Sequence, residues 1–248
     1  MKLATWNVNG IRARALDLMN WIAVEAPDVL CLQEIKASPE QVPDLLKMLP
    51  DYWSYWHGAG GYSGVALLVN RRLCPCEPAW AHPAFNFEQR VAMVTLGDTT
   101  VASVYVPNGG KDFDAKMRFL ESLRELAGAA RQAAGSIALC GDLNVTRADI
   151  DVHPKERKPR AIGQLPIERE ALGRLLEEGL VDVARQLEPD NDALFTWWAP
   201  WRNMRQRNIG WRLDYVLASG PLAARVRRCT VYREVGTSDH APVVAEIP

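Results

Sequence analysis

Acidic and amide side chains stand at the ends of several apolar runs in the sequence. Asn7 follows the first run, Glu34 follows Val-Leu-Cys-Leu-Gln, Asp142 and Asn144 follow Ile-Ala-Leu-Cys-Gly, and Asp239 precedes the last run. Strand ends are where α/β sheets bind ligands, since side chains converge there. An Asp or Asn taken alone at such a position is typical of a turn or a helix cap, whereas Glu34, close behind four apolar residues, is drawn toward the interior. Together their oxygens suit a hard cation such as Mg²⁺, and the scarcity of Cys and His disfavours zinc.

One histidine joins these acids. His240 directly follows Asp239, and adjacent residues of an extended strand cannot face each other, so His240 needs another carboxylate to orient it. Asp214 is the candidate, because it interrupts the apolar run 213–217, where a charge needs a partner. An Asp–His pair orients a base or stabilises an imidazolium. The alternatives are a structural role for His240 and core packing for Tyr105, which ends the run 101–105.

A segment rich in Trp and Arg lies between residues 197 and 212. It holds four Trp and four Arg in sixteen residues, whereas the whole chain, with 29 basic and 30 acidic residues, has a net charge of −1. That balance excludes a globally basic nucleic-acid binder and leaves room for a local basic patch. Such a segment is typical either of a structural loop or of a surface that neutralises phosphates and inserts aromatic side chains into DNA.

A second acidic motif, Asp149-x-Asp151-x-His153, has spacing that could also suggest a metal site. The residues after it are Lys155, Glu156, Arg157 and Lys158. We therefore predict a solvated loop near DNA rather than a metal site.

The hydrophobic pattern alternates between strands and helices. Strands are predicted at 2–6, 28–33, 64–69, 91–96, 100–106, 136–140, 213–217, 226–232 and 242–247, and helices at 12–25, 39–48, 114–133 and 167–179. Some neighbouring strands have no helix between them, which predicts antiparallel pairs in a mixed sheet. Without a linker or a repeat, residues 1–248 are predicted to form one α/β domain.

The cysteines and the N-terminus bear on the environment of the protein. The five cysteines form no Cys-x-x-Cys pair, so neither a disulfide framework nor a zinc site is indicated, and Cys31 and Cys140 fall in buried runs. The chain starts directly with a strand, which disfavours a signal peptide, and no apolar run is long enough to span a membrane. We expect a cytoplasmic protein with no membrane contact.

Seven short motifs follow one another along the chain. They are Thr5-Trp6-Asn7-Val8-Asn9-Gly10-Ile11-Arg12, Leu32-Gln33-Glu34-Ile35-Lys36, Gly64-Val65-Ala66, Tyr105-Val106-Pro107-Asn108-Gly109, Gly141-Asp142-Leu143-Asn144, Gly210-Trp211-Arg212-Leu213-Asp214-Tyr215 and Ser238-Asp239-His240-Ala241-Pro242. In order and content they resemble the motifs of the exonuclease III family of abasic-site (AP) endonucleases, which have DNase I-like folds. The resemblance implies a four-layer α/β sandwich, two packed mixed sheets flanked by helices.

The resemblance also implies roles for individual residues. Glu34 matches the main Mg²⁺ ligand, with Asn7 and Asp239 close to the same pocket, and Mn²⁺ is an alternative metal. Asp142 matches the residue that orients or deprotonates the attacking water, and Asn144 the amide that holds this water and a phosphate oxygen, both beside the metal. His240, oriented by Asp214, and Tyr105 match residues that contact the scissile phosphate. Contacts to DNA are implied for Arg12, Asn108, Trp197, Trp201, Arg207, Trp211 and Leu213.

By this resemblance the protein is a DNA-repair hydrolase that acts as a monomer on double-stranded DNA. It is expected to cleave 5′ to abasic sites, to repair blocked 3′ ends and to degrade DNA in the 3′→5′ direction. Two other classes of protein fit the sequence less well. A sphingomyelinase or inositol-phosphate phosphatase should lack the Trp–Arg segment, and a non-catalytic DNA-binding protein should not place acids where they repel phosphate.

Overall fold

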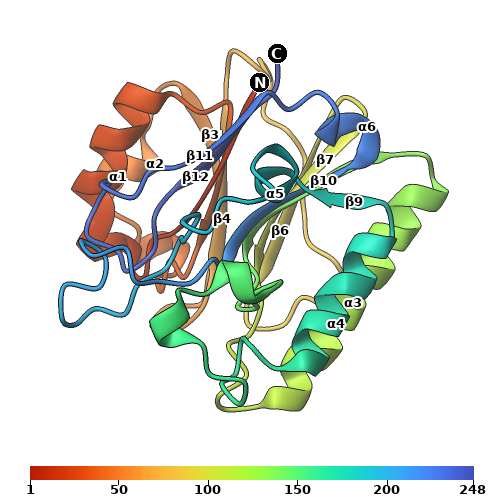
Figure 1. Ribbon diagram of the computed structural model, residues 1–248. Coiled ribbons are helices and arrows are strands. Elements are labelled where there is room, and N and C mark those ends of the chain that lie inside the picture. Colours follow the sequence, from red (N-terminus) through yellow and green to blue (C-terminus); the bar gives the residue numbers. More distant parts are fainter.

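Two six-stranded sheets pack face to face in the computed structural model, which describes residues 1–248 (Figure 1). The first sheet has the order β11 (Arg228–Val231), β12 (Val243–Glu246), β1 (Lys2–Asn7), β2 (Val29–Gln33), β4 (Val65–Asn70) and β3 (Tyr52–His57). The second has the order β5 (Trp80–Ala81), β6 (Val91–Leu96), β7 (Thr99–Tyr105), β8 (Ser136–Asp142), β10 (Asp214–Ser219) and β9 (Leu180–Asp182). Both sheets mix parallel and antiparallel pairs, as predicted.

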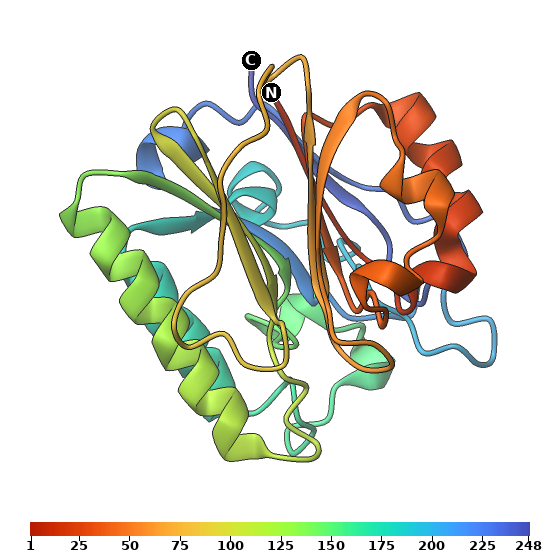
Figure 2. The same ribbon diagram turned by 180° about the vertical axis from the view of Figure 1, so that it is seen from behind.

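Helices cover the outer face of each sheet, which gives four layers. Helices α1 (Ile11–Glu25) and α2 (Asp44–Lys47) lie on the first sheet, and α3 (Phe113–Gln132) and α4 (Pro166–Glu177) lie on the second (Figures 1 and 2). Short helices α5 (Val183–Leu187) and α6 (Gly220–Ala223) flank β10, and 3₁₀ turns occur at Pro39–Gln41, Asp149–Asp151 and Pro154–Glu156. The expected four-layer α/β sandwich is confirmed.

The alternation of side chains along the central strands explains this layering. In β2, Val29 and Cys31 enter the core between the sheets, while Leu30 and Leu32 pack toward α1 and α2. In β8, Cys140 enters the same central core and Leu139 packs toward α3 and α4. Strands that are apolar at every position therefore belong to the middle layers, as in other sheets buried on both faces.

The predicted bounds of most strands and helices agree closely with the structure. One predicted helix was wrong. The segment 39–48 is not a continuous helix, because it is divided by Val42 and Pro43 into a 3₁₀ turn and the short α2. Strands β3, β5 and β9 and helices α5 and α6 were not predicted. Of these, β3 is six residues of mostly aromatic sequence, Tyr-Trp-Ser-Tyr-Trp-His, whose β propensity was the available signal.

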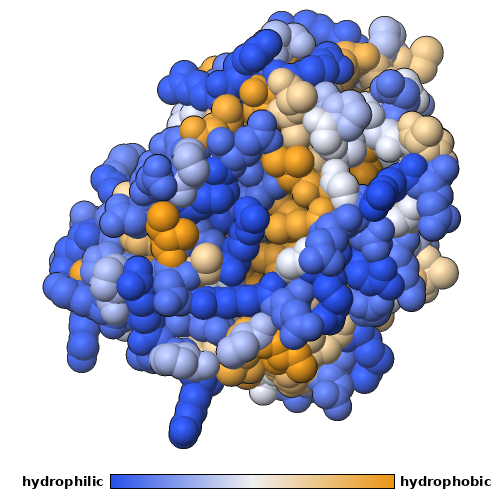
Figure 3. All heavy atoms as spheres, turned by 45° about the vertical axis from the view of Figure 1, so that its right-hand side comes forward, coloured by the Kyte–Doolittle hydropathy of each residue, from blue (hydrophilic) through white to orange (hydrophobic).

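The outer surface is largely polar. Figure 3 shows a mostly hydrophilic face with apolar atoms gathered in a hollow across its middle. Cys31 and Cys140 are buried between the sheets, where burial holds the pKa of the Cys31 thiol well above its usual value. None of the helices combines the length and the hydrophobicity required to cross a bilayer.

Candidate active site

Strand ends from both sheets meet at one end of the sandwich. In the second sheet, Asp142 is paired with Tyr105 of the parallel strand β7 and with Asp214 of the antiparallel strand β10. In the first sheet, β1 runs parallel to β2, so Asn7 ends beside Gln33 and Glu34. The Asn7 amide joins the two sheets, since its Nδ2 donates to Glu34 Oε1 and to Asp142 Oδ2, both at 2.9 Å.

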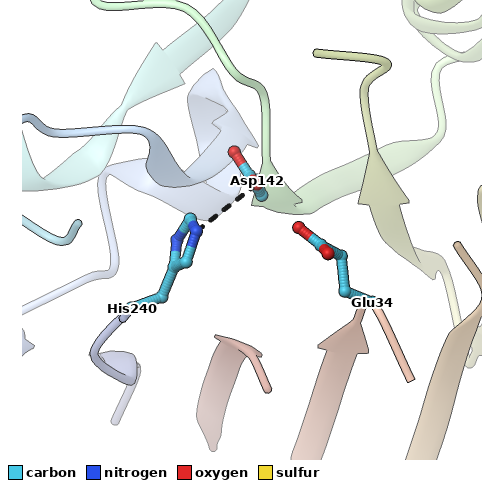
Figure 4. Close-up of side chains that lie close together, drawn as sticks. All are labelled: Glu34, Asp142 and His240. Atoms are coloured by element: carbon cyan, nitrogen blue, oxygen red, sulfur yellow. Dashed lines mark ion pairs between the residues drawn. The ribbon is translucent and has the colours of Figure 1, made fainter. Parts of the chain in front are cut away.

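Three side chains converge here and are named the acid cluster: Glu34, Asp142 and His240. Their ligand atoms lie within 4.8 Å of one another. Figure 4 shows Glu34 at the end of a strand of the first sheet, Asp142 at the end of a strand of the second, and His240 on a loop, all pointing toward one another. Residues that are about 100 positions apart in the sequence thus form one site.

Glu34 stands at a turn of the chain. Its φ of 51° is left-handed, which is unusual for a residue with a side chain. Lys36 Nζ lies 2.8 Å from Glu34 Oε2, and Asn7 bonds the other oxygen. Burial alone would raise the pKa of Glu34, but the hydrogen bonds from Asn7 and Lys36 hold the pKa below its usual value, so the group is a carboxylate.

Asp142 is almost completely buried and accepts hydrogen bonds only from neutral groups. Its oxygens accept from the Asn144 backbone at 2.9 Å, from Asn144 Nδ2 at 3.2 Å and from Asn7. His240 Nε2 lies 3.9 Å away. Burial, together with the charges of Asp214 and Glu34, raises the pKa of Asp142 well above its usual value although His240 opposes the shift. The site therefore holds more negative charge than its cations balance.

The predicted Asp214–His240 pair is present. His240 Nδ1 lies 2.8 Å from Asp214 Oδ2, so Nε2 is left facing Glu34 and Asp142. Thr196 Oγ1 donates to the same Asp214 oxygen at 2.6 Å and accepts from the Asp214 backbone at 3.0 Å. Burial alone would lower the pKa of His240, but the charges of Asp214, Asp142 and Asp239 raise it well above its usual value.

Asp239 lies at the edge of the site and not in the acid cluster. Its two oxygens accept hydrogen bonds from Asn9 Nδ2 at 2.8 Å and from Trp197 Nε1 at 3.0 Å. Burial would raise the pKa of Asp239, but His240 and these two bonds hold it below its usual value. Asp239 thus links the acid cluster to the aromatic side of the site.

A cavity of about 420 Å³ contains most of the predicted site residues. It is lined by Asn9, Glu34, Lys36, Tyr105, Asn108, Asp142, Asn144, Ile162, Trp197, Trp211, Leu213, Asp239 and His240. Trp197 and Trp211 meet edge to face with ring centroids 5.4 Å apart and form one wall. Tyr105 also lines the cavity, and burial together with the charges of Glu34 and Asp142 raises its pKa, so the phenol keeps its proton.

Five predicted residues do not line this cavity. Asn7 and Asp214 are buried behind Glu34 and His240, to which they are bonded. Arg12, on the first turn of α1, and Arg207 are exposed. Trp201 is 60% exposed, so its indole does not pack under its own loop.

The Trp–Arg segment is structural in part and exposed in part, so both roles that its sequence allowed occur in different residues. Trp198 is buried. Arg205 donates to the backbone carbonyls of Arg233, Val235 and Ser238. Arg212 is 1% exposed and enclosed by carboxylates. Only Arg202 and Arg207 of the four arginines are exposed.

The Asp149-x-Asp151-x-His153 motif is not a solvated loop throughout, and that prediction was wrong for Asp151. Asp151 is 1% exposed and pairs with Arg212 at 2.8 Å and with Arg185 at 2.6 Å. Asp149 pairs with Arg169 at 2.8 Å, and His153 Nδ1 accepts from the Lys155 backbone. The three residues serve separate structural contacts, and the motif does not gather into a metal site.

Three lining residues were not predicted from the sequence as site residues. Lys36 bonds both Glu34 and Asn9, at 2.8 and 2.5 Å, and Ile162 reaches the cavity from a distant loop. Lys36 and Asn9 lie two residues after Glu34 and Asn7, within motifs already recognised, so spacing was an available signal. No local pattern marks Ile162.

The chemistry of these donors fits a divalent oxygen-seeking cation. Two carboxylates and an imidazole converge, and the amide of Asn7 holds both carboxylates in place. Carboxylates crowded without a balancing cation are costly to bury, and a metal ion offsets this cost. Oxygen donors match Mg²⁺ or Mn²⁺ better than zinc.

Comparison with known proteins agrees with this geometry. Residues 4–240 match the Endonuclease/Exonuclease/phosphatase family. The chain is 37% identical to an exodeoxyribonuclease of Bacillus subtilis over 98% of both proteins. Its fold superposes on a 3′ phosphatase, NExo, from Neisseria bound to product DNA hairpin, with a TM-score of 0.90, 32% identity and coverage of 100% and 99% of the two chains. An AP endonuclease from Archaeoglobus fulgidus gives a TM-score of 0.88 at 28% identity, with the same coverage.

The chain therefore belongs to the endonuclease/exonuclease/phosphatase family. Within this family it is a nuclease of the exonuclease III type, as its ordered motifs predicted, and its function is that of a DNA-repair hydrolase.

Proposed function

We propose that the protein is a Mg²⁺-dependent AP endonuclease that hydrolyses the phosphodiester 5′ to an abasic site in duplex DNA and leaves a 3′-hydroxyl. The observation that carries this proposal is that the acid cluster and the wall formed by Trp197 and Trp211 share one cavity. Hydrolytic groups and a recognition surface for a sugar without a base thus lie side by side. Similarity to an exodeoxyribonuclease and to the 3′ phosphatase and 3′-5′ exonuclease NExo supports further activities on 3′ phosphates and 3′→5′ exonuclease activity.

Glu34 and Asp142 would hold the metal, with Asn144, His240 and Asp239 around it. When bound, Mg²⁺ supplies positive charge that stabilises the developing charge on the phosphate oxygens and the leaving 3′-oxygen. Manganese fits the same donors.

The residues of the chain account for the other requirements of phosphodiester hydrolysis. Asp142 orients the attacking water and accepts its proton. The Nδ2 of Asn144 donates to Asp142 at 3.2 Å and to the Val106 carbonyl at 3.0 Å, so its Oδ1 accepts a hydrogen bond from this water. His240, fixed by Asp214, donates from Nε2 to the phosphate, and the protonated Tyr105 donates to another oxygen. Asn108 and Arg12 contact the DNA backbone.

Selectivity for the lesion comes from the aromatic wall. Trp197, Trp211 and Leu213 form a space that accepts an extruded sugar and excludes a nucleotide carrying its base. Trp201 and Arg207 extend the contact to the duplex outside the cavity. We propose that the enzyme works as a monomer in the cytoplasm, where it meets double-stranded DNA.

An incision assay tests the proposal. Purified protein with Mg²⁺ should cut a duplex carrying one abasic analogue 5′ to the lesion, and chelation by EDTA should stop the reaction. Matched substrates are an undamaged duplex, a duplex with a 3′-phosphate, sphingomyelin and an inositol phosphate. Hydrolysis of a phospholipid or sugar phosphate with the abasic duplex left intact would show that the proposal is wrong.

A further inference from the structure

A completely buried ion pair lies beneath the cavity and outside the site described so far. Lys116, in the first turn of α3, and Glu168, in the first turn of α4, both have side chains that are 0% exposed. Their charged atoms are in direct contact, Lys116 Nζ with Glu168 Oε1. Neither residue touches the cavity, because neither belongs to its lining.

The remaining hydrogen bonds of Lys116 reach two site loops. Its Nζ donates to the backbone carbonyl of Asn144 at 2.7 Å and to that of Asn108 at 3.2 Å. An ammonium group has three donors, and here all three are used. One buried cation thereby ties together the loop after β8 and the loop after β7, whose side chains Asn144 and Asn108 also meet at 3.3 Å.

Glu168 holds the third loop of the site. Its Oε2 accepts from the backbone of Gly163 at 2.7 Å and of Leu165 at 3.0 Å. Gly163 has a φ of 90°, and a Cβ there would lie 3.2 Å from both the Asn144 carbonyl oxygen and Trp211. Gly163 is thus clamped between the residue proposed to hold the water and the aromatic wall.

The backbone of Asn144 has a left-handed conformation that turns its carbonyl oxygen to Lys116. Its φ is 52°, which Asn adopts more readily than other residues with a side chain. The side chain is aimed by bonds to Asp142 and to the Val106 carbonyl, while the backbone carbonyl is held by Lys116. A buried ion pair is a weak source of stability compared with apolar residues of similar size, so its benefit here lies elsewhere.

We infer that Lys116 and Glu168 are positioning residues, which set the orientation of Asn144 and Asn108 toward the scissile phosphate from behind the cavity. This inference rests on the proposed function, since it assigns the pair its effect through Asn144. The ion pair affects Asn144 and Asn108, which face the phosphate. It does not contact Glu34, the carboxylate proposed to bind the metal.

A neutral double variant, Lys116→Met/Glu168→Gln, tests the inference without leaving one buried charge unpaired. Incision of an abasic duplex should fall in kcat by about 10- to 100-fold, the range expected when a reacting group is displaced by about 1 Å. The Mg²⁺ concentration for half-maximal activity should change less than about twofold, because Glu34 keeps its contacts. A normal kcat in the folded variant would overturn the inference.

Leu123→Ala provides the matched control for destabilisation. Leu123 is completely buried on the same helix, packs in the apolar core under the second sheet, and does not line the cavity. The cavity it leaves should lower Tm without changing kcat appreciably. If Leu123→Ala lowers kcat as much as the double variant at a similar loss of Tm, the role of the pair is only structural and the inference is wrong.

A double-mutant cycle with Asn144→Ala identifies the route of the effect. If the pair acts through Asn144, adding the double variant to Asn144→Ala should lower kcat little further, whereas additive losses would overturn the inference. A wild-type protein that does not cut the abasic duplex would instead refute the proposed function, so the two failures are distinguishable.

Discussion

Two groups of buried acids in this molecule differ in how their charge is balanced. The arginine cluster consists of Asp151, Asp182, Arg185 and Arg212. Arg212 donates to both acids, from Nε to Asp151 at 2.8 Å and from Nη2 to Asp182 at 2.7 Å. Each carboxylate there faces a guanidinium. Burial would raise the pKa of Asp151, but Arg212 and Arg185 hold it below its usual value.

The acid cluster is balanced much less completely. Asp142 is bonded by amides, and its nearest cationic group is His240 at 3.9 Å. Accordingly, the pKa of Asp142 shifts upward whereas that of Asp151 shifts downward, although both groups are 1% exposed. Unbalanced charge in the folded protein therefore indicates a metal site at the acid cluster. In the Asp-x-Asp-x-His motif, whose spacing resembles that of a metal site, arginines neutralise the charge of Asp151.

The greatest loss of activity is expected from a substitution in the acid cluster. Asp142→Asn should lower kcat for abasic incision by about 10²–10⁴-fold, because the water loses its orienting carboxylate and proton acceptor. Binding of the abasic duplex should persist or tighten, since a negative charge facing phosphate is removed. Single-turnover incision and a binding titration measure the two quantities. A fully active Asp142→Asn protein contradicts the role given to Asp142.

The matched substitution in the arginine cluster, Asp151→Asn, should affect the stability of the protein much more than its rate of incision. Loss of one partner of a buried ion pair costs about 3–5 kcal/mol, and the free energy of unfolding should fall by this order. The folded-state pKa of Asp151 is lowered, so its contribution is complete above the unfolded value of about 3.9 and is lost as the pH falls below it.

Urea unfolding of wild type and Asp151→Asn at neutral pH and near pH 3 measures this difference. The two curves should be far apart at neutral pH and closer at acid pH. A constant separation across this range would mean that the charge of Asp151 is not the source of its contribution. Incision by the folded variant should stay within about tenfold of wild type.

Metal binding should distinguish the acid cluster from the arginine cluster. Mg²⁺ at about 100 times its Kd should stabilise the wild-type protein by about 2.7 kcal/mol, which corresponds to a rise in Tm of roughly 5–10 °C. Asp151→Asn should show the same rise, because the arginine cluster binds no metal. Glu34→Ala should reduce the rise and the metal affinity, and an undiminished rise in that variant would place the metal elsewhere.

The sequence predicted more of the acid cluster than of its surroundings. Glu34, Asp142 and His240 lie in short motifs at strand ends, and a regular strand carries its last residue to the edge of the sheet. The environment of Asp151 could not be predicted, because Arg185 and Arg212 lie 34 and 61 residues away and reach it only through tertiary packing. The same holds for Arg205 and Trp198, whose partners lie in the distant segment 233–241 between β11 and β12. The predicted helix at 39–48 failed for a local reason, since Pro43 interrupts it.

Two tryptophans of one loop, Trp201 and Trp198, differ in the same way in how their apolar surface is covered. It is 60% exposed, whereas Trp198, three residues before it in the same loop, is 1% exposed and belongs to a small apolar core with Phe195 and Met204. A large exposed indole beside the cavity is an apolar surface without a partner in the folded chain. We predict that it enters the duplex next to the lesion, where the gap left by an extruded sugar offsets an unstacking cost of a few kcal/mol.

Trp201→Ala should weaken binding to an abasic duplex by about tenfold, or about 1.4 kcal/mol, while Tm stays nearly unchanged because little buried surface is lost. Trp198→Ala is the matched control of the same chemistry. Removal of that buried ring should lower the stability by about 3–5 kcal/mol. A fall in Tm for Trp201→Ala with intact DNA affinity would contradict insertion of Trp201 into the duplex. It would mean that the exposed indole stabilises the loop and does not contact the DNA.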